Sequence, residues 1–221
     1  NAGNYCVCNP NDTYVTAGSF SITNAGLYVT SSATLGVVRG TLNFSAGKWY
    51  WEVKYVTGNA SELAGICTPT ATDPGGVGTY GYYVNGNMYA SGSVTAYGTS
   101  VSAGDIIGVA VDMDNGKIFF SKNGTWQNSG DPAAGTNPGA TGISGNYLPT
   151  VQDGASASNG AYDINFGQRA FTYTPPSGFK ALNTYNLASV RPAASSMWFY
   201  GDTPDLMWIK NRSTKIGRAH V

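Results

Sequence analysis

The amino-acid sequence predicts an all-β protein of antiparallel strands, and three observations lead to this prediction. The chain has 30 glycines among its 221 residues, and 42% of the residues are hydrophobic while only 11% are charged. No window carries the three- and four-residue spacing of apolar residues that marks an amphipathic helix over three turns. Short apolar or alternating runs recur instead, separated by Gly, Asn, Asp and Pro, as is typical of strands joined by turns.

The first third of the chain contains alternating segments that end at turn-forming residues. The expected strands cover residues 19–22, 27–30, 37–44, 49–56 and 62–67. Asn24-Ala25-Gly26 separates the first two strands, so we expect a short hairpin there. A loop rich in Gly and Pro follows at residues 73–78.

The clearest strand signal lies in the middle of the chain. Residues 105–112 form a nearly continuous apolar run, which is expected of a strand at the centre of a sheet. Asp114-Asn115-Gly116 favours a tight turn, and residues 117–121 return as the next strand. Asn123-Gly124 is a second turn, so this segment is predicted to be an antiparallel meander. Asp105 is expected to anchor a loop through backbone amides.

A long segment without strand character follows the meander. Residues 128–145 are rich in Gly, Pro, Ala and Asn, and a loop of this length is functional, flexible or an insertion. Further strands are expected at residues 147–151 and 162–166. Pro175-Pro176-Ser177-Gly178 closes the unit.

The pattern changes from about Asn183. Apolar runs at residues 197–200 and 206–209 suggest that residues 183–215 form a linker and the truncated start of a second β domain. The alternative is a C-terminal hairpin that packs on the first domain. The last six residues, 216–221, match the translation of a widely used DNA sequencing adapter. We therefore interpret them as an artefact on a fragment of an environmental sequence, and exclude them together with His220, the only histidine.

Six short motifs follow one another between Gly47 and Phe171. They are Gly47–Val53 (G-x-x-Y-W-E-V), Gly81–Tyr83 with Gly86-Asn87, Gly104–Asp112 (G-D-x-I-G-x-x-x-D), Phe119–Gly124 (F-x-x-N-G), Leu148–Val151, and Asn165-Phe166-Gly167 with Phe171. Together these motifs resemble those of the SPRY domain family. Their order and spacing agree with the family over about residues 40–182. The resemblance implies a concanavalin A-like jelly roll, a sandwich of two antiparallel sheets over residues 1–182, with strands in 1–46 completing it.

The resemblance also implies a non-catalytic module that recognises a ligand through loops at one rim. One departure from the family pattern follows Asn123-Gly124, where the family continues with Gly and an apolar run. Here Thr125-Trp126-Gln127-Asn128 leads into the long loop instead. No known peptide pocket of the family is therefore carried over to this chain.

Two softer resemblances suggest a biological setting. Residues 1–12 and 204–213 are similar to segments of structural proteins of marine bacteriophages, which carry SPRY modules. The primary hypothesis is therefore a binding module of a phage virion or tail fibre, located on the virion or outside the cell. The alternative is a protein–protein adaptor of a cellular organism. A carbohydrate-binding or glycoside hydrolase domain is disfavoured, because hydrolysis needs a carboxyl pair and the only glutamates are Glu52 and Glu62; no enzyme is expected.

Aromatic residues near turns are the candidate binding residues, because they offer a large contact area with a polar group. They are Tyr82, Tyr83, Tyr89, Tyr97 and Trp126. The expected partner is a protein or a cell-surface glycan, and oligomers could form through neighbouring domains.

Other partner classes are disfavoured by composition. The net charge is zero and no run of Lys or Arg occurs, which argues against nucleic acid, and no apolar stretch is long enough for membrane insertion. No cofactor or metal is expected: three cysteines form neither a zinc motif nor a disulfide framework. Residues 112–116 lack the glutamate of a calcium loop, so we interpret them as a turn.

Overall fold

The computed structural model describes residues 3–32, 34–72, 76–154 and 159–190. The strands are β1 (Cys8–Ala17), β2 (Phe20–Thr23), β3 (Tyr28–Ser31), β4 (Thr34–Gly40), β5 (Lys48–Thr57), β6 (Glu62–Cys67), β7 (Thr79–Tyr83), β8 (Asn87–Ala90), β9 (Ser93–Ala96), β10 (Ile106–Asp112), β11 (Lys117–Lys122), β12 (Thr125–Trp126), β13 (Leu148–Asp153), β14 (Ala161–Asn165) and β15 (Lys180–Ala181). Short 3-10 turns form at η1 (Asn24–Gly26) and η2 (Gln127–Ser129), and α1 (Thr184–Val190) is the α-helix of the described residues.

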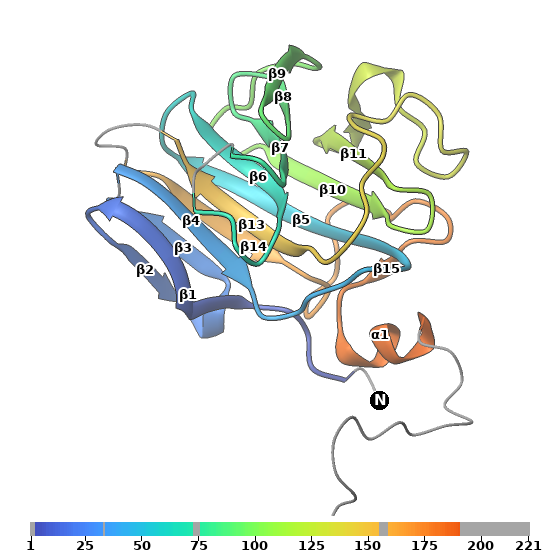
Figure 1. Ribbon diagram of the computed structural model, residues 1–221, viewed down its shortest axis with the longest axis horizontal. Coiled ribbons are helices and arrows are strands. Elements are labelled where there is room, and N and C mark those ends of the chain that lie inside the picture. The colour runs from blue at the N-terminus through green and yellow to red at the C-terminus, as the bar shows by residue number, and fades with distance from the viewer. Residues whose placement is uncertain (1–2, 33, 73–75, 155–158, 191–221) are drawn as a thin grey trace, which may run out of the picture. The chain divides into compact units, whose positions relative to one another are not determined.

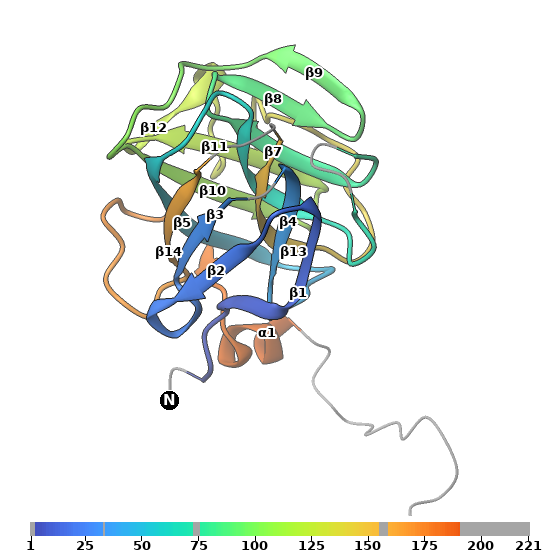
Figure 2. The same ribbon diagram turned by 90° about the vertical axis from the view of Figure 1, so that its left-hand side faces the viewer.

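Two sheets face each other, which confirms the all-β sandwich (Figure 1). The first sheet has the order β1-β4-β13-β6-β7-β8-β9, and the second has the order β12-β11-β10-β5-β14-β3-β2. Neighbouring strands in these paths are antiparallel, while β15 pairs with β5 in parallel. On one side of the sandwich the edge strands β1 and β2 contact each other (Figure 2).

Strand β5 explains how the core is divided. Successive side chains of a strand point to opposite faces of its sheet. Trp49, Trp51 and Val53 therefore lie in the main core between the sheets, whereas Tyr50 lies on the outer face. The outer face of β5 is covered too, because Phe179 packs there with Tyr50 in a second, smaller cluster.

The expected central meander is confirmed. Strand β10 lies between β5 and β11, and its last six residues are all buried, as the continuous apolar run indicated. Asp112 pairs with Lys117 across the hairpin, and the turn uses Gly116 with a φ of +60°. The expected loop anchor is confirmed as well, since Asp105 Oδ2 accepts a hydrogen bond from Ser102 N (2.7 Å).

The long segment after β12 lies along the second sheet. Gly139 N donates to Ile118 O (2.8 Å), Ile118 N donates to Ala140 O (3.2 Å), and Ile143 N donates to Gly116 O (3.1 Å). The side chain of Ile143 is 3% exposed. Residues 139–143 therefore run beside β11 and cover part of that strand's edge.

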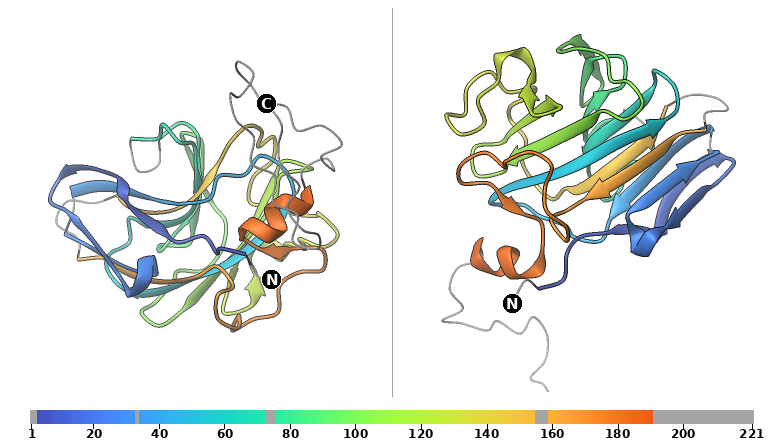
Figure 3. Two further views of the ribbon diagram at one scale, coloured as in Figure 1. Left: turned by 90° about the horizontal axis from the view of Figure 1, so that it is seen from below. Right: turned by 180° about the vertical axis from the view of Figure 1, so that it is seen from behind.

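The two ends of the described sandwich meet. Thr184 N donates to Asn4 O (2.9 Å), and Asn4 N donates to Thr184 Oγ1 (2.9 Å), so α1 lies beside the N-terminal segment (Figure 3). The sequence signalled neither this helix nor β1. Cys6 and Cys8 of this segment are buried free thiols, and burial raises the pKa of Cys6 to about 11.

Of the expected linker and second β domain at residues 183–215, the described part carries α1 (Thr184–Val190). The two apolar runs and the adapter-like tail lie in residues 191–221, outside the described residues, and stay predictions. Within the described residues, no helix has the length and apolar character needed to cross a membrane.

Candidate functional site

A cleft of about 370 Å³ opens at the rim of the sandwich near the end of β11. It lies between the loop that follows β9 and the segment from the end of β11 to η2. The lining residues are Thr99, Lys122, Asn123, Thr125, Trp126, Gln127 and Asn128. This cleft occupies the point where the sequence departs from the family pattern.

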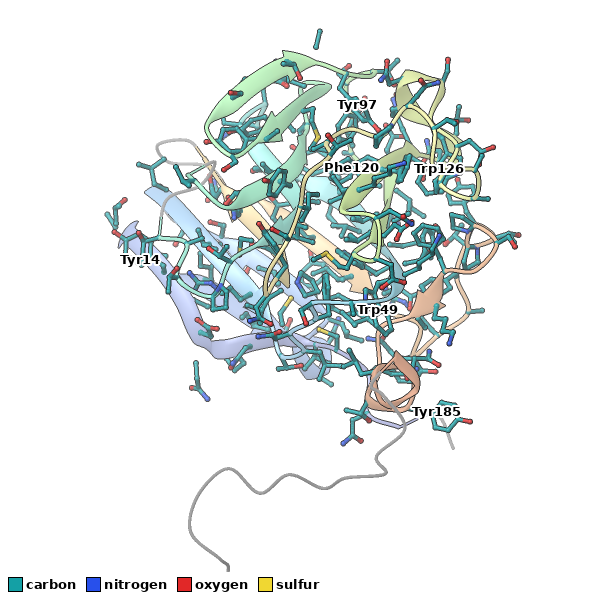
Figure 4. The ribbon with its side chains drawn as sticks, turned by 45° about the vertical axis from the view of Figure 1, so that its right-hand side comes forward. Tyr14, Trp49, Tyr97, Phe120, Trp126 and Tyr185 are labelled. Atoms are coloured by element: carbon teal, nitrogen blue, oxygen red, sulfur yellow. The ribbon has the colours of Figure 1, made fainter. Side chains whose placement is uncertain are left out.

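Trp126 contributes the aromatic surface of the cleft (Figure 4). Its indole meets the buried ring of Tyr50 edge to face, with ring centroids 6.4 Å apart. Tyr50 is itself held edge to face by Phe171 at 5.0 Å. Because one side of the indole packs on this cluster and the ring is only partly buried, Trp126 is held in place while it still lines the cleft.

Gln127 joins the two loops that form the walls. Its side chain is 7% exposed, and its Oε1 accepts hydrogen bonds from Thr99 N (3.0 Å) and Thr99 Oγ1 (3.2 Å). Its Nε2 donates to Thr125 O (2.8 Å). A buried amide whose oxygen and nitrogen are both bonded holds its neighbours at fixed positions. The cleft is therefore preformed.

The lining of the cleft includes one positive charge, that of Lys122, which is compensated by a carboxylate. Lys122 Nζ lies 3.1 Å from Asp105 Oδ2 and donates to Ser100 O (2.7 Å). Burial alone would raise the pKa of Asp105, but hydrogen bonds from Ser102 and Asn123 and the ion pair with Lys122 outweigh burial and lower it. Because Lys122 is the only lining residue with an ionisable side chain, the cleft presents a ring, amides and hydroxyls rather than net charge.

The structure separates the five predicted aromatic residues into three groups. Trp126 lines the cleft. Tyr82 is 0% exposed and stacks on Phe120 at 5.7 Å, so the expectation that it lies on an accessible loop is wrong; it belongs to the core face of β7. Tyr97 is partly buried and meets Tyr82 edge to face at 5.7 Å, with its hydroxyl accepting from Phe120 N (3.3 Å).

Tyr82 and Tyr97 pack in the interior beneath the loop that carries Thr99. The Tyr82 hydroxyl donates to Thr99 O, and burial raises the pKa of both tyrosines to about 12. The third group, Tyr83 and Tyr89, lies on strands β7 and β8 and forms an edge-to-face pair at 5.9 Å. Tyr89 is 7% exposed and Tyr83 is partly buried. Neither tyrosine lines the cleft.

Sequence reasoning missed the polar residues that shape the cleft. Thr99 and Gln127 belong to no motif of the family. The one available signal was the departure after Asn123-Gly124, which places Gln127 directly after Trp126.

Comparisons with known proteins agree with this architecture. A model of the SPRY domain family matches residues 48–169. The dual specificity protein kinase splA of Dictyostelium discoideum is 31% identical over 102 residues, which are 43% of this chain and 4% of the kinase. The E3 ubiquitin-protein ligase RKP of Arabidopsis thaliana is 31% identical over 172 residues, which are 75% of this chain and 13% of the ligase.

A solved structure shares the fold. The crystal structure of the SPRY domain of human HERC1 superposes with a TM-score of 0.61 and 18% sequence identity, covering 74% of this chain and 99% of that domain. The chain thus corresponds to nearly all of one solved domain but to a small part of the two curated relatives.

Proposed function

This chain belongs to the SPRY domain family, and from that membership we propose that it is a non-catalytic module that binds a partner protein through the Trp126 cleft. SPRY domains are generally interaction modules that mediate contacts between proteins. The proposal concerns which surface of this member does so.

The single observation that carries the proposal is the placement of Trp126. Tryptophan is enriched among the residues that dominate protein interfaces, because its large ring buries much area at a small cost in conformational entropy. Here the ring is held by Tyr50 and lines a cleft whose walls are joined by Gln127. Amides and hydroxyls around an indole suit the peptide groups of a protein segment.

The relatives favour a cellular partner protein over the other candidates. Both curated relatives are proteins of cellular organisms, one a kinase and one a ubiquitin ligase. They favour the protein–protein adaptor over the role in a phage virion or tail. They give no support to a location on a virion. The only observation in favour of a glycan ligand is the aromatic ring of Trp126, and glycan binding is one outcome of the test below.

The experiment is a selection of random 12-residue peptides, displayed on their encoding mRNA, against the purified chain. Recovered peptides are resynthesised, and their affinities are measured by isothermal titration calorimetry. We expect Trp126→Ala to weaken binding at least 10-fold, since removing a central aromatic anchor costs about 2 kcal/mol or more. Circular dichroism and the Tm establish that the variant is folded.

Tyr185→Ala is the matched control, because it removes another aromatic ring, one that is 61% exposed and lies on α1. It should leave the affinity unchanged. Equal loss in both variants, or peptides that bind Trp126→Ala as tightly as the unmodified chain, would overturn the proposal. The proposal would also be overturned if no peptide were recovered while the chain bound a glycan on an array in a way that depends on Trp126.

A further inference from the structure

The sheet edges of this sandwich are protected unequally. An edge strand presents unpaired N–H and C=O groups, and proteins usually protect it with charge, proline, a bulge or covering segments. On one side, β1 and β2 contact each other, and β1 also carries Pro10, Asp12 and a register shift between Cys8 and Thr13. On the other side, β12 has only two residues, and residues 139–143 cover part of the neighbouring β11.

Strand β9 has none of these protections. Its residues Ser93-Val94-Thr95-Ala96 are all exposed, and its pairing with β8 runs in regular register without a bulge. It contains no charge and no proline. Figures 1 and 2 show β9 at the outer edge of its sheet. Of the sheet edges in the described residues, it is the one open to another strand.

The register tells which backbone groups face outward. Ser91 and Gly92, with φ of +45° and +101°, form the two-residue turn between β8 and β9. Ser91 N donates to Thr79 O (2.8 Å), so the backbone N–H of Ser91 points toward β7. Backbone groups alternate in direction along a strand, so those of Tyr89 also point toward β7, whereas those of Met88 and Ala90 point toward β9. The backbone groups of their partners, Thr95 and Ser93, point back toward β8 and pair with them. The N–H and C=O groups of Val94 and Ala96 therefore point away from β8.

An apolar strip accompanies this edge. Val94 is 56% exposed and lies directly opposite Tyr89, which pairs edge to face with Tyr83. Met88 belongs to the main core, so Tyr89 and Val94 lie on the opposite, outer face of the sheet. A strand added to β9 would place alternate side chains beside this strip.

Charge narrows the kind of partner that fits. Residues 74–104, which include all of β7, β8 and β9, contain no Asp, Glu, Lys or Arg. A partner segment with charges along its length would lose hydration there without gaining an ion pair. The edge therefore fits an uncharged segment with a high propensity for extended structure.

The edge leads directly to the Trp126 cleft. Thr99 follows Ala96 by three positions, at most about 10 Å of extended chain, and Thr99 lines the cleft. Thr99 N is bonded to Gln127 Oε1 and Ser100 O to Lys122 Nζ, so the edge and the cleft belong to one continuous framework. The test peptides are long enough to contact both, since twelve extended residues span roughly 40 Å.

We infer that the partner segment binds as an additional strand on β9, through the outward groups of Val94 and Ala96, and places a side chain in the Trp126 cleft. This inference rests on the proposed function and names the chemistry of its partner: an uncharged, extended protein segment. Backbone hydrogen bonds supply affinity in such strand addition, and alternate side chains supply specificity.

The test uses a peptide recovered in the selection against the whole chain. Each backbone N–H of the peptide is methylated in turn, and binding is measured by calorimetry. A strand that adds to an edge uses every second N–H, so we expect at least 10-fold weaker binding at alternate positions and little change between them. Methylation that has no effect, or an effect without this period of two, would overturn the inference.

A pair of variants tests the same edge from the protein. Val94→Pro removes the outward N–H without touching the ladder to β8, and should weaken binding at least 10-fold. Val94→Thr keeps the N–H and the branched shape, and should therefore weaken binding much less than Val94→Pro does. The methylated peptides leave the protein intact, so they decide the matter even where Val94→Pro does not fold.

Failure of the inference is distinguishable from failure of the proposed function. If Trp126→Ala weakens binding while the methylated peptides and Val94→Pro do not, the cleft is the site and strand addition is wrong. If neither change matters, both are wrong. A concentration-dependent dimer in sedimentation that Val94→Pro abolishes, without any effect on peptide binding, would assign the edge to a second copy of this chain and overturn the inference.

Discussion

Asp105 and Asn123, which lie 18 residues apart, are joined by a hydrogen bond of 2.6 Å from Asn123 Nδ2 to Asp105 Oδ1. Asn123 Oδ1 in turn accepts from Ile106 N (2.8 Å), and the backbone of Asn123 is left-handed with a φ of +49°. The two residues belong to the Gly104–Asp112 and Phe119–Gly124 motifs. Their bond explains physically why an Asp and an Asn at this spacing occur together beside the cleft.

We predict that Asn123→Ala destabilises the chain by about 2 kcal/mol. The change removes both side-chain hydrogen bonds, and alanine tolerates a positive φ less well than asparagine does. Urea unfolding followed by tryptophan fluorescence measures the difference. Asn11→Ala, at an exposed position on β1, is the control and should change the free energy of unfolding by less than about 0.5 kcal/mol. Equal effects would contradict the structural role of Asn123.

The chain should lose stability in acid, in part through Asp112. Burial would raise the pKa of Asp112, but hydrogen bonds from Asn115 and the ion pair with Lys48 (2.9 Å) outweigh it and lower the pKa below the ordinary 3.8. A carboxyl whose pKa is lower in the folded state stabilises that state above its unfolded pKa, and this contribution disappears as the pH falls through the folded pKa.

Urea midpoints at pH 7, 5 and 3 measure this effect. Asp112→Asn should lower the midpoint at pH 7 and should reduce the difference between pH 7 and pH 3. A variant whose midpoint falls between pH 7 and pH 3 as steeply as that of the unmodified chain would show that Asp112 is not responsible.

Glu52 is predicted to be a structural residue. It is 3% exposed, and its carboxylate accepts hydrogen bonds from Thr172 N (2.9 Å) and Tyr173 N (2.8 Å), while Tyr50 Oη lies 3.2 Å away. Glu52→Gln replaces one acceptor with a donor that faces an N–H, and should cost about 2–3 kcal/mol in the free energy of unfolding. Phe171 directly precedes Thr172 and packs on Tyr50, whose ring in turn contacts Trp126. A shift of these amides should therefore also change the fluorescence of Trp126. Unchanged stability would refute this assignment.

Gly65 and Gly81 form a directly opposed pair on β6 and β7, and this close approach predicts the effect of a methyl group. A Cβ at Gly65 would clash with the backbone oxygen of Tyr80, which cannot rotate away. Gly65→Ala should therefore destabilise the chain by about 3 kcal/mol or prevent folding. A Cβ at Gly142 would meet no atom within 4 Å, but the φ of this residue is +72°. Gly142→Ala should therefore lower the free energy of unfolding by only about 1 kcal/mol. Thermal unfolding of the two variants provides the comparison.

Several central strands and the hairpin in the middle of the chain could be predicted from the sequence, but the order of the strands in the two sheets could not. The apolar run of 105–112, the turn at Gly116 and the aromatic alternation of 49–56 indicated β10, its hairpin and β5, because burial of a central strand on both sides leaves a local signature. Strand β9 carried no such signature. All four of its residues are exposed, so its pairing with β8 depends on the turn at Ser91 and Gly92 rather than on hydrophobic pattern.

The site divides in the same way. The sequence by itself determined that Trp126 stands where the family pattern ends. It grouped Tyr82 and Tyr83 alike as aromatics near turns, although neighbouring residues of a strand such as β7 point to opposite faces of the sheet. Only the tertiary structure decided which face is inside, because that depends on the second sheet: Tyr82 stacks on Phe120 from β11, while Tyr83 meets Tyr89 on the outer face. The bond between Gln127 and Thr99 also joins residues 28 positions apart, and long-range contacts of polar residues leave no periodic trace in a single sequence.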